Sequence, residues 1–420
     1  MKNNLWRVID FCNKHKATQN LYPFLKKHIK KGDFKIDSLA SPKPYADEKN
    51  ENPRITILLP SLRKSKVFGG ISTALDFFYK IVDQTPEIDA RIIVISGETF
   101  DENLTINMGE YSKENKHKQL LFLADDKNVE VRKNDVFIFT TWGSAYSFSP
   151  VVEWIEKHFN KKSKSIYLIQ DYEPGFAAWS AWYALAEATY KNRADSTIAV
   201  FNSKELYEYF KFNGYQFSEE YYFRPSLNEK LKEKLLNVGH NLNRKKTIII
   251  YGRPNEPRNA FEIIRYSLKL WSERYPHANE WKIISMGAPV NDIKFMNNTL
   301  KSLGKVSLDK YAKTMLEAYA GISLMISPHP SYPPLEMSTF GVKTITNNFC
   351  NKNLSDFNDN INSIDKCTPE EICRRLSEIC DSYSEVNSRE GIIMNESYLE
   401  PTDFYDVIKA VQHSISQRIS

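Results

Sequence analysis

The sequence predicts an α/β fold made of two halves, each with a parallel β-sheet at its centre. Short apolar and β-branched runs alternate with amphipathic helical stretches along most of the chain, which is the pattern of parallel α/β sheets. The runs form two series, and a polar, irregular segment at residues 226–245 separates them. With 420 residues, the chain is long enough for each half to bury a core of its own.

Nine runs are expected to be buried strands, with helices between them. The first series is Arg54–Leu62, Arg91–Ser96, Asp135–Trp142, Ser165–Gln170 and Ser196–Ser203. The second series is Lys246–Gly252, Lys282–Gly287, Gly321–Pro328 and Lys343–Asn348. We therefore expect two Rossmann-like domains, residues 1–235 and 236–400, with a C-terminal helix at about 400–420 that packs back on the first. Ligands of such sheets bind outside the carboxyl ends of the strands, here in the cleft between the domains.

The composition is that of a globular protein, with 41% hydrophobic and 26% charged residues. No apolar run approaches the roughly 18 to 20 residues of a membrane span, and the N-terminus lacks the apolar block of a signal peptide, so we expect a cytoplasmic location. The five cysteines are odd in number and include no C-x-x-C pair. Cys373 and Cys380 lie seven residues apart and are expected to be core thiols.

The net charge of +5 is modest, but the segment Phe24–Lys35 is an early basic block with apolar neighbours. It suits a solvated face, which we favour, or a peripheral contact with anionic lipid at the inner face of the plasma membrane. Nucleic acid is not expected as a partner, because no recognised binding motif accompanies the charge.

Two loops after predicted strands carry groups that suit phosphate. Gly69 and Gly70 precede a helix, where bare backbone can approach a phosphate closely, although the pair also suits an ordinary turn. Arg253 and Arg258 follow the first strand of the second half, and the planar guanidinium matches phosphate oxygens. Lys305 follows another predicted strand end and is a third candidate charge.

The segment "SPHPSYPPLEMSTFG" predicts a helix with a fixed start. Proline at the first helical turn loses no hydrogen bond, so Pro333 and Pro334 mark the start of a helix. Glu336 is then expected in the first turn, near unpaired backbone N–H groups that also attract polar ligands. The alternative is a glutamate with a purely electrostatic role at the helix start.

Three strings give the chain a resemblance to a known family. "YLIQDYEPGFAAWSAWYALAEATY", "YGRPNEPRNAFEI" and "SPHPSYPPLEMSTFGVKTITN" resemble the GT-B glycosyltransferases of family 4, and more narrowly the WsaF group. The resemblance runs from about Arg54 to Arg374. It implies a GT-B fold, with two Rossmann-like domains facing each other across a cleft, and transfer of L-rhamnose from dTDP-β-L-rhamnose to a bacterial cell-surface polysaccharide.

The resemblance also implies roles for single residues. Glu336 matches the second acid of the family's paired-glutamate motif, which binds the nucleotide ribose, and the first acid is replaced by Pro328. His329 or the backbone after Pro330 is then expected to hold the donor sugar. Arg253 matches the phosphate-binding arginine, and Arg258 stands where the family usually has lysine.

The "QDYEP" loop ends a strand of the first domain and is expected to face the acceptor. Family 4 enzymes retain the anomeric configuration, and Asp171 or Glu173 is expected to orient the acceptor hydroxyl or to accept its proton. The alternative is that these two acids only cap the following helix. Aromatic side chains nearby can stack on sugar faces or belong to the core: Tyr172, Phe176, Trp179 and Trp182.

We therefore predict a metal-independent glycosyltransferase without a cofactor, because no D-x-D triplet occurs and positive groups must stabilise the leaving diphosphate. Its partners are a nucleotide sugar and a lipid-linked or oligosaccharide acceptor. The alternatives are a UDP- or GDP-linked donor, a catalytically silent binding protein of the same fold, or an epimerase. The predicted residues are Arg253, Lys305 and Asp171 for catalysis; Gly69, Gly70, Arg258, His329 and Glu336 for the donor; and Gln170, Tyr172, Glu173 and Trp179 for the acceptor.

Overall fold

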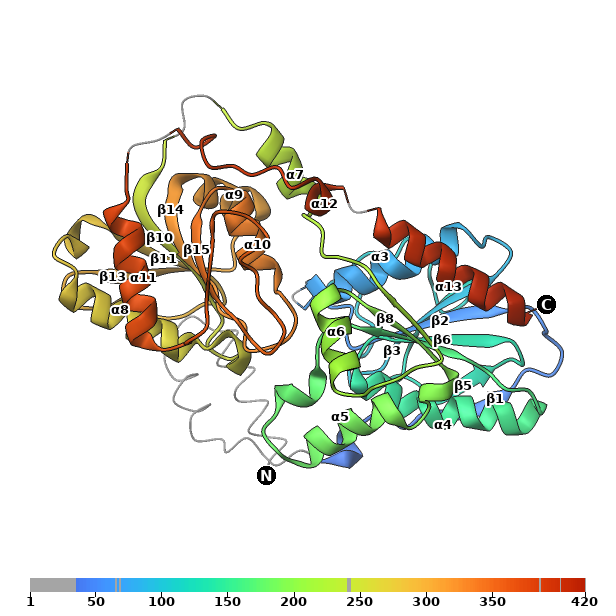
Figure 1. The fold of residues 1–420 in the computed structure, drawn as a ribbon. Coiled ribbons are helices and arrows are strands. Elements are labelled where there is room, and N and C mark those ends of the chain that lie inside the picture. The colour runs from blue at the N-terminus through green and yellow to red at the C-terminus, as the bar shows by residue number, and fades with distance from the viewer. Residues whose placement is uncertain are drawn as a thin grey trace. The chain divides into compact units, whose positions relative to one another are not determined.

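Two seven-stranded sheets carry the fold of the computed structural model (Figure 1). The structure describes residues 35–64, 66–67, 69–239, 243–384, 387–400 and 402–419. The chain divides into two units, Met1–Leu39 and Ala40–Ser420, and both sheets belong to the second unit. The first unit contributes the short 3-10 helix η2 (Ile36–Ser38), and the basic block before Lys35 lies outside the described residues, as does Cys12.

The first sheet is parallel throughout, in the order β4-β3-β2-β6-β7-β8-β9. Its strands are β2 (Arg54–Leu59), β3 (Asp89–Val94), β4 (Lys118–Phe122), β6 (Asp135–Phe139), β7 (Ser165–Ile169), β8 (Thr197–Phe201) and β9 (Glu219–Tyr222). A separate pair consists of β1 (Lys43–Ala46) and β5 (Asn128–Val131).

The second sheet has the order β12-β13-β11-β10-β14-β15-β16, and β12 alone among them is antiparallel to its neighbour. Its strands are β10 (Lys245–Gly252), β11 (Lys282–Gly287), β12 (Ile293–Lys294), β13 (Thr299–Gly304), β14 (Ala318–Ile322), β15 (Lys343–Asn347) and β16 (Ile361–Ile364).

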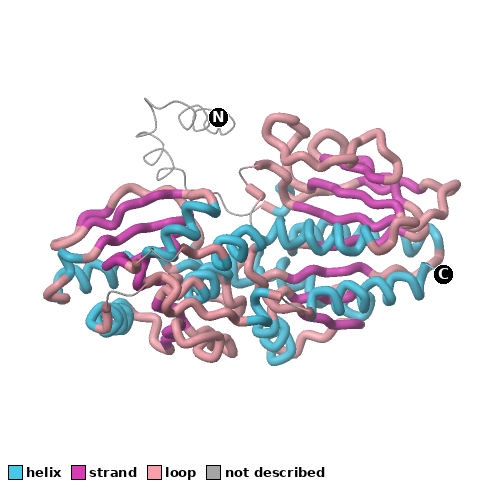
Figure 2. The backbone as a smooth tube through the Cα atoms, turned by 90° about the horizontal axis from the view of Figure 1, so that it is seen from above, coloured by secondary structure: helices cyan, strands magenta, loops and turns pink. Residues whose placement is uncertain are grey.

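Helices cover both faces of each sheet, as Figures 1 and 2 show. The α-helices are α3 (Gly69–Asp83), α4 (Trp142–Phe159), α5 (Ala181–Lys191), α6 (Lys204–Phe212), α7 (Glu229–Leu236), α8 (Phe261–Arg274), α9 (Leu308–Glu317), α10 (Tyr332–Thr339), α11 (Pro369–Asp381), α12 (Glu396–Leu399) and α13 (Asp403–Ile419). Short 3-10 helices are η3 (Glu173–Phe176), η4 (Ala194–Ser196), η5 (Pro257–Asn259) and η6 (Ala278–Glu280). No helix of the described ranges combines the length and apolar character of a membrane span.

The α/β prediction is confirmed, and eight of the nine predicted strands end within three residues of the observed ones. The ninth, Gly321–Pro328, is wrong, because β14 begins at Ala318 and ends at Ile322. Beyond Ile322, the backbone of Met325 bonds to the side chain of Asn347 instead of continuing the ladder. The residues that follow are therefore a loop at the carboxyl edge of the second sheet.

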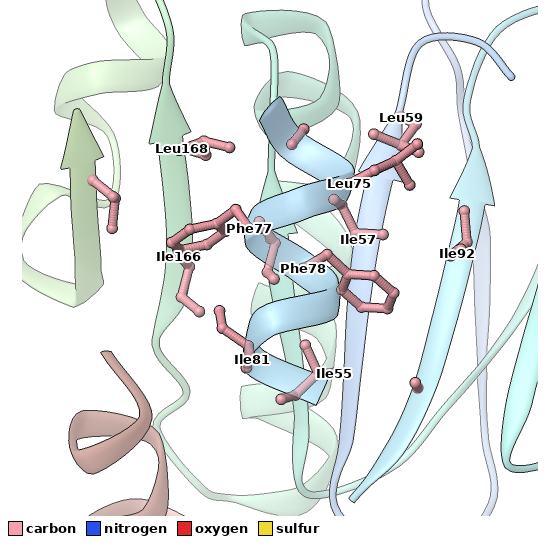
Figure 3. Packing of buried hydrophobic residues seen from close by; sticks show 14 of the residues in the cluster. Ile55, Ile57, Leu59, Leu75, Phe77, Phe78, Ile81, Ile92, Ile166 and Leu168 are labelled. Carbon is pink, nitrogen blue, oxygen red and sulfur yellow. The ribbon is translucent and has the colours of Figure 1, made fainter. Parts of the chain in front are cut away.

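The core of the first sheet forms where apolar helix faces meet continuous apolar strands. Figure 3 shows Leu75, Phe77, Phe78 and Ile81 of α3 packed on Ile57 and its neighbours. The C-terminal helix α13 adds its apolar face to the same cluster, with the residues Val407, Ile408, Val411 and Ile415. In the second domain Cys373 and Cys380 are buried on α11, which confirms them as core thiols. The predicted domain limits stay a prediction.

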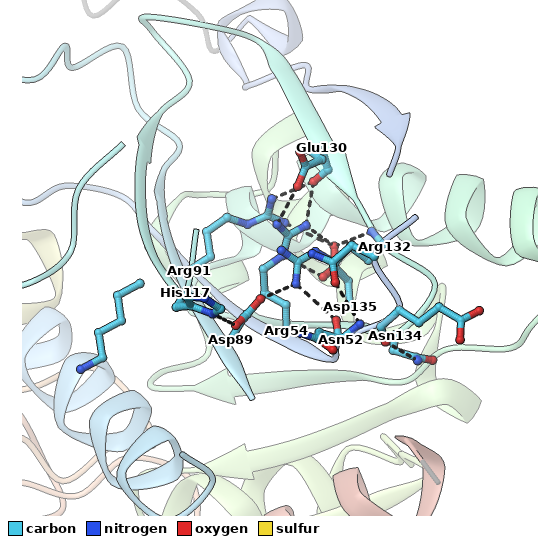
Figure 4. A network of polar contacts seen from close by, with 12 residues as sticks. Asn52, Arg54, Asp89, Arg91, His117, Glu130, Arg132, Asn134 and Asp135 are labelled. Carbon is cyan, nitrogen blue, oxygen red and sulfur yellow. Dashed lines mark hydrogen bonds and ion pairs between the residues drawn. The ribbon is translucent and has the colours of Figure 1, made fainter. Parts of the chain in front are cut away.

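A buried charge network closes the amino ends of β2, β3 and β6, at the edge opposite to the strand ends that carry ligand-binding loops (Figure 4). Asp135 accepts from Arg54 Nε at 2.9 Å and Nη2 at 2.8 Å, and from the backbone N–H of Arg132 at 3.0 Å. Arg91 adds a 3.5 Å contact to the same carboxylate, and burial lowers its pKa to about 9. The network therefore balances buried arginines with buried carboxylates.

We expect Asp135→Asn to lower the free energy of unfolding by about 3 to 5 kcal/mol, because it leaves buried guanidinium groups without their counter-charge. Urea denaturation followed by circular dichroism measures the loss. The matched control is Asp309→Asn, which removes one exposed ion pair with Lys234 and is expected to change nothing measurable. Equal stability of the two variants would contradict a structural role for the network.

Candidate functional site

The loops that carry the predicted site residues all follow the carboxyl ends of strands. The loop after β7 carries Gln170 and Asp171, and the loop after β10 carries Arg253 and Arg258. The loop from Ser323 to Ser331 follows β14 and leads into α10. The structure brings several of these residues into contact, and it leaves others apart.

Asp171 is the acid that contacts residues from the loops after β10 and β14. It is buried, and its Oδ2 pairs with Arg258 Nη1 while its Oδ1 accepts a hydrogen bond from the Ser327 hydroxyl. The backbone N–H of Tyr172 also donates to Oδ1, at 2.8 Å. A predicted acceptor-side acid thus contacts a predicted donor-side arginine, and Ser327 joins them without having been predicted.

Arg258 is held on both sides. Its guanidinium carbon lies 3.7 Å from the centre of the Phe176 ring, a cation–π contact, and Glu256 lies 3.8 Å from Nη2. Its carbonyl accepts from the backbone N–H of Ile326 at 2.7 Å, which ties the arginine to the loop after β14. The charge predicted for a phosphate is therefore fixed in place by the protein.

Arg253 is more open, with a 42% exposed side chain and one ion pair, to Glu256 at 3.4 Å. The strand ends around it approach closely, since the backbone N–H of Ala288 donates to the Gly252 carbonyl at 2.8 Å. A methyl group on Gly287 would lie 2.7 Å from that carbonyl and 3.4 Å from Arg253 Cγ. Gly287 therefore packs directly against the end of β10 and the stem of Arg253, where a side chain would not fit.

Glu336 does not lie in the first turn of its helix, so that expectation is wrong. The prolines are confirmed at the helix start, but Tyr332 is the first residue of α10 and Glu336 is the fifth. The helix begins earlier because Ser331 turns the chain, with a φ of 69° and a ψ of 147°. Such a conformation is close to glycine-only and is typical of functional loops.

The carboxyl group of Glu336 instead faces tyrosines. Tyr311 donates its hydroxyl to Oε2 at 2.9 Å, and burial raises the pKa of Glu336 to about 7, against the lowering effect of that hydrogen bond. The charges of Glu336 and Arg253 both act on Tyr251, whose pKa burial raises. Glu336 and Arg253 therefore share one neighbourhood, around Tyr251 at the end of β10.

His329 is buried, and its ring is neutral. Nδ1 accepts from the backbone N–H of Ser331 at 3.0 Å, and burial lowers the pKa of the imidazole to about 4. The proton of a neutral ring must then sit on Nε2, which is buried without a hydrogen-bond partner in the described part of the chain. An unused donor of this kind fits the predicted contact with a donor sugar.

The predicted glycine pair lies beside the acceptor loop. Gly69 and Gly70 begin α3, and a methyl group on Gly70 would come within 3.2 Å of Gln170 Oε1. That oxygen is buried and has no partner in the described ranges. The Thr73 hydroxyl, one turn further along α3, lies 3.5 Å from the hydroxyl of Tyr332, so this helix start faces that of α10.

The other acceptor-side residues divide into core and surface. Tyr172 packs in an aromatic cluster, with its hydroxyl 3.1 Å from that of Tyr215, so its ring belongs to the core of the first domain. Glu173 accepts from the backbone N–H of Trp142 at 2.5 Å and thus caps α4, a helix that precedes it. Burial raises the pKa of Glu173 to about 8, and the charge of Asp171 adds to the rise.

Trp179 is the exposed aromatic of this loop. Its side chain is 90% exposed and stacks on Tyr183, with ring centres 5.4 Å apart. Trp182 packs 5.0 Å from Trp142 and so belongs to the helix packing. Of the predicted sugar-stacking rings, Trp179 remains available to a ligand, whereas Phe176 lies under Arg258.

Lys305 is exposed at the end of β13, and β11 lies between that strand and β10. Lys305 thus follows a different strand from the one that leads to Arg253 and Arg258. Three residues near the site were missed from the sequence: Ser327, Tyr311 and Lys352. Within the described ranges, no group of three or more histidine, cysteine or acidic residues is placed to hold a metal ion.

Comparison with known proteins gives two matches to family models. Residues 54–204 match the N-terminal domain of WsaF, and residues 246–377 match its C-terminal domain. Over 214 residues, 51% of this chain, the sequence is 29% identical to the O-antigen biosynthesis protein RfbC of Myxococcus xanthus. The match covers 15% of that relative, so the chain spans only a small part of its length.

Solved structures share the fold at low sequence identity. Sucrose-phosphate synthase from Thermosynechococcus elongatus has a TM-score of 0.51 at 8% identity and covers 88% of this chain and 97% of its own. The trehalose 6-phosphate synthase of Burkholderia multivorans has a TM-score of 0.52 at 7% identity, over 87% and 97%. Anabaena HepE in complex with UDP-glucose has a TM-score of 0.50 at 10% identity, over 87% and 95%. These likenesses show the GT-B fold.

We expect Glu336→Gln to stabilise the free protein at pH 8 by at most about 3 kcal/mol. The folded-state pKa of about 7 lies above the ordinary value of 4.5, so burial of the ionised carboxylate lowers stability as the pH rises through 7. The gain should shrink to about 1 kcal/mol at pH 5, where the carboxyl group is protonated in the fold but still partly ionised in the unfolded chain.

Thermal unfolding of both proteins at pH 5 and pH 8 measures this difference. Glu390→Gln at an exposed position is the control and should be neutral at both pH values. A destabilised Glu336→Gln at pH 8 would mean that the ionised carboxylate has a structural role.

Proposed function

Because this chain belongs to the WsaF family of GT-B glycosyltransferases, we propose that it transfers L-rhamnose from dTDP-β-L-rhamnose to a growing bacterial cell-surface polysaccharide. The neighbourhood shared by Arg253 and Glu336 at the end of β10 is the observation that carries this proposal. It offers a cation to a diphosphate and a carboxylate to a sugar hydroxyl within the reach of one nucleotide.

In the proposed reaction, the acceptor hydroxyl attacks the anomeric carbon while the bond from that carbon to the diphosphate oxygen breaks. The hydroxyl attacks from the same face that the diphosphate leaves, so the configuration is retained. Its proton passes to the departing diphosphate oxygen, so no strong general base is needed. Arg253 and Arg258 stabilise the charge that develops on the diphosphate, and no metal ion is needed for that step.

The acceptor binds on the first domain in this proposal. Trp179, exposed and stacked on Tyr183, offers a face for a sugar ring, and Asp171 orients the acceptor hydroxyl. When the donor binds, its diphosphate replaces Asp171 as the partner of the Arg258 guanidinium. The acceptor is lipid-linked or an oligosaccharide, and the protein works in the cytoplasm, with the basic block Phe24–Lys35 as a peripheral contact with the inner membrane.

A UDP-linked donor is the second candidate, because the structural neighbour HepE is in complex with UDP-glucose. A product assay separates the two. The protein is incubated with a rhamnose-terminated acceptor and either dTDP-rhamnose or UDP-glucose, and mass spectrometry finds the extended glycan. Nucleotide binding without any product would favour a silent binding protein of the same fold.

We expect Arg253→Ala to lower the transfer rate about 10- to 100-fold, because a charge-assisted contact to the leaving group contributes about 1.5 to 3 kcal/mol. Initial rates at saturating acceptor measure the loss. Arg265→Ala is the matched control, since Arg265 also pairs with a nearby glutamate, Glu262, but lies on the exposed side of α8. Wild-type turnover of Arg253→Ala would remove this residue from the site.

Chelation should leave the reaction unchanged. We expect the same initial rate with and without EDTA, because the guanidinium groups stabilise the diphosphate in place of an ion. The measurement is repeated after dialysis and after addition of Mg²⁺ or Mn²⁺. Inhibition by EDTA that either ion reverses would overturn the metal-free mechanism.

A further inference from the structure

Lys352 is a fully buried lysine beside the site. It follows β15 and ends a tight turn in which the N–H of Lys352 donates to the Phe349 carbonyl at 2.9 Å and the N–H of Phe349 donates back at 3.1 Å. Cys350 within this turn has a φ of 51°, a conformation that disfavours residues with a side chain. The chain thus adopts a strained turn that holds the lysine inside.

The ammonium group of Lys352 lacks a full set of acceptors. Nζ donates to the Met325 carbonyl at 2.6 Å, and no ion pair of the described residues includes it. Arg244, an equally buried cation, donates to four carbonyls instead: those of Met315, Ala318, Phe340 and Ser388. A buried ammonium with one neutral partner is costly, so a ligand is expected to complete its coordination.

His329 supplies an independent sign of a ligand at the same place. Its Nε2–H is more than nine-tenths buried and has no acceptor in the described part of the chain. Both residues contact the same short loop: Lys352 Nζ donates to the Met325 carbonyl, and the backbone N–H of His329 donates to the Ser327 hydroxyl at 3.1 Å. That hydroxyl in turn donates to Asp171, so a charged donor and a neutral donor lie along the loop that contacts this carboxylate.

We propose that Lys352 and His329 form a subsite that binds a phosphoryl group of a substrate, with the ammonium as counter-ion and Nε2–H as hydrogen-bond donor. This deepens the proposed function and rests on it. In the free protein the nearby carboxylate of Asp171 offsets part of the positive charge. Phosphoryl oxygens supply the acceptors that both donors lack.

The phosphoryl group has two sources in such a reaction, the nucleoside diphosphate of the donor and the diphosphate of a lipid-linked acceptor. Calorimetry with dTDP, UDP and inorganic pyrophosphate tests the first source, and the KM for a lipid-diphosphate acceptor tests the second. The variant is Lys352→Met, which keeps the length and apolar stem of the side chain. Lys301→Met at an exposed position of β13 is the control.

We expect Lys352→Met to weaken the binding of dTDP, UDP and pyrophosphate about 10- to 100-fold. The free variant should unfold at the same temperature as the wild type or at a higher one. A gain in stability with a loss of affinity is the result that a structural lysine would not give. Unchanged nucleotide affinity with a raised acceptor KM also supports the subsite and assigns it to the acceptor.

Two results would overturn the proposal. One is wild-type affinity for all three anions together with a wild-type acceptor KM. The other is a lower unfolding temperature of Lys352→Met, because the lysine would then hold the turn through Met325. The calorimetric measurements need no sugar transfer, so a subsite that binds pyrophosphate through Lys352 survives even if the rhamnosyltransferase proposal fails.

Proton uptake gives a second readout. Burial lowers the pKa of Lys352 to about 8, and pairing with a phosphoryl group raises it again, so binding at pH 8 should take up protons in the wild type and fewer in Lys352→Met. Calorimetry in two buffers of different ionisation enthalpy measures the uptake. The other titratable groups whose charges reach Lys352 are Asp171, Glu205, His329, Cys350 and Cys367, and all are retained in the variant.

Discussion

The contact of Asp171 with Arg258 and Ser327 joins the carboxyl edge of the first sheet to loops of the second. The arrangement of the site depends on it, because the loops after β7, β10 and β14 all meet at this one carboxylate. Arg258 is braced from the other side by Phe176, which belongs to the same loop as Asp171. An anion that bound Arg258 would compete with Asp171, and its binding would therefore be coupled to the contact between the two sheets.

Buried cations in this protein fall into two kinds. Arg54 is paired with carboxylates, and Arg244 is surrounded by carbonyls, so each has its hydrogen bonds largely made within the fold. Arg253 and Lys352 lie near the strand ends, and each has N–H groups left to donate to a ligand. A buried cation with most of its partners within the fold is expected to be structural, and one with few partners is expected to bind a ligand. Counting the hydrogen-bond partners of each cation therefore distinguishes structural from ligand-binding cations better than burial alone.

The sequence predicted what depends on periodicity and on residue types that follow strands. The α/β class, eight strands of the two sheets and the positions of Arg253 and Gly70 at strand and helix ends came from local pattern. The sequence-based prediction failed where tertiary contacts determine the position of a residue. Glu336 was placed one turn too early because the φ of Ser331 is invisible in the letters, and Lys352 was missed because "CNKN" reads as a solvated polar loop.

The loop between β14 and α10 also determines the polarity of the hydrogen bonds that the proposed subsite offers. The resemblance places an acid at position 328, where this chain has proline, and a carboxylate there would only accept hydrogen bonds from hydroxyls. His329 offers a neutral N–H, which donates to a phosphoryl oxygen in the proposed subsite. A neutral donor also adds no negative charge beside a diphosphate, whereas a second carboxylate would repel it. The loss of the acid therefore leaves a loop that is more favourable to anions, beside Lys352 and the two arginines.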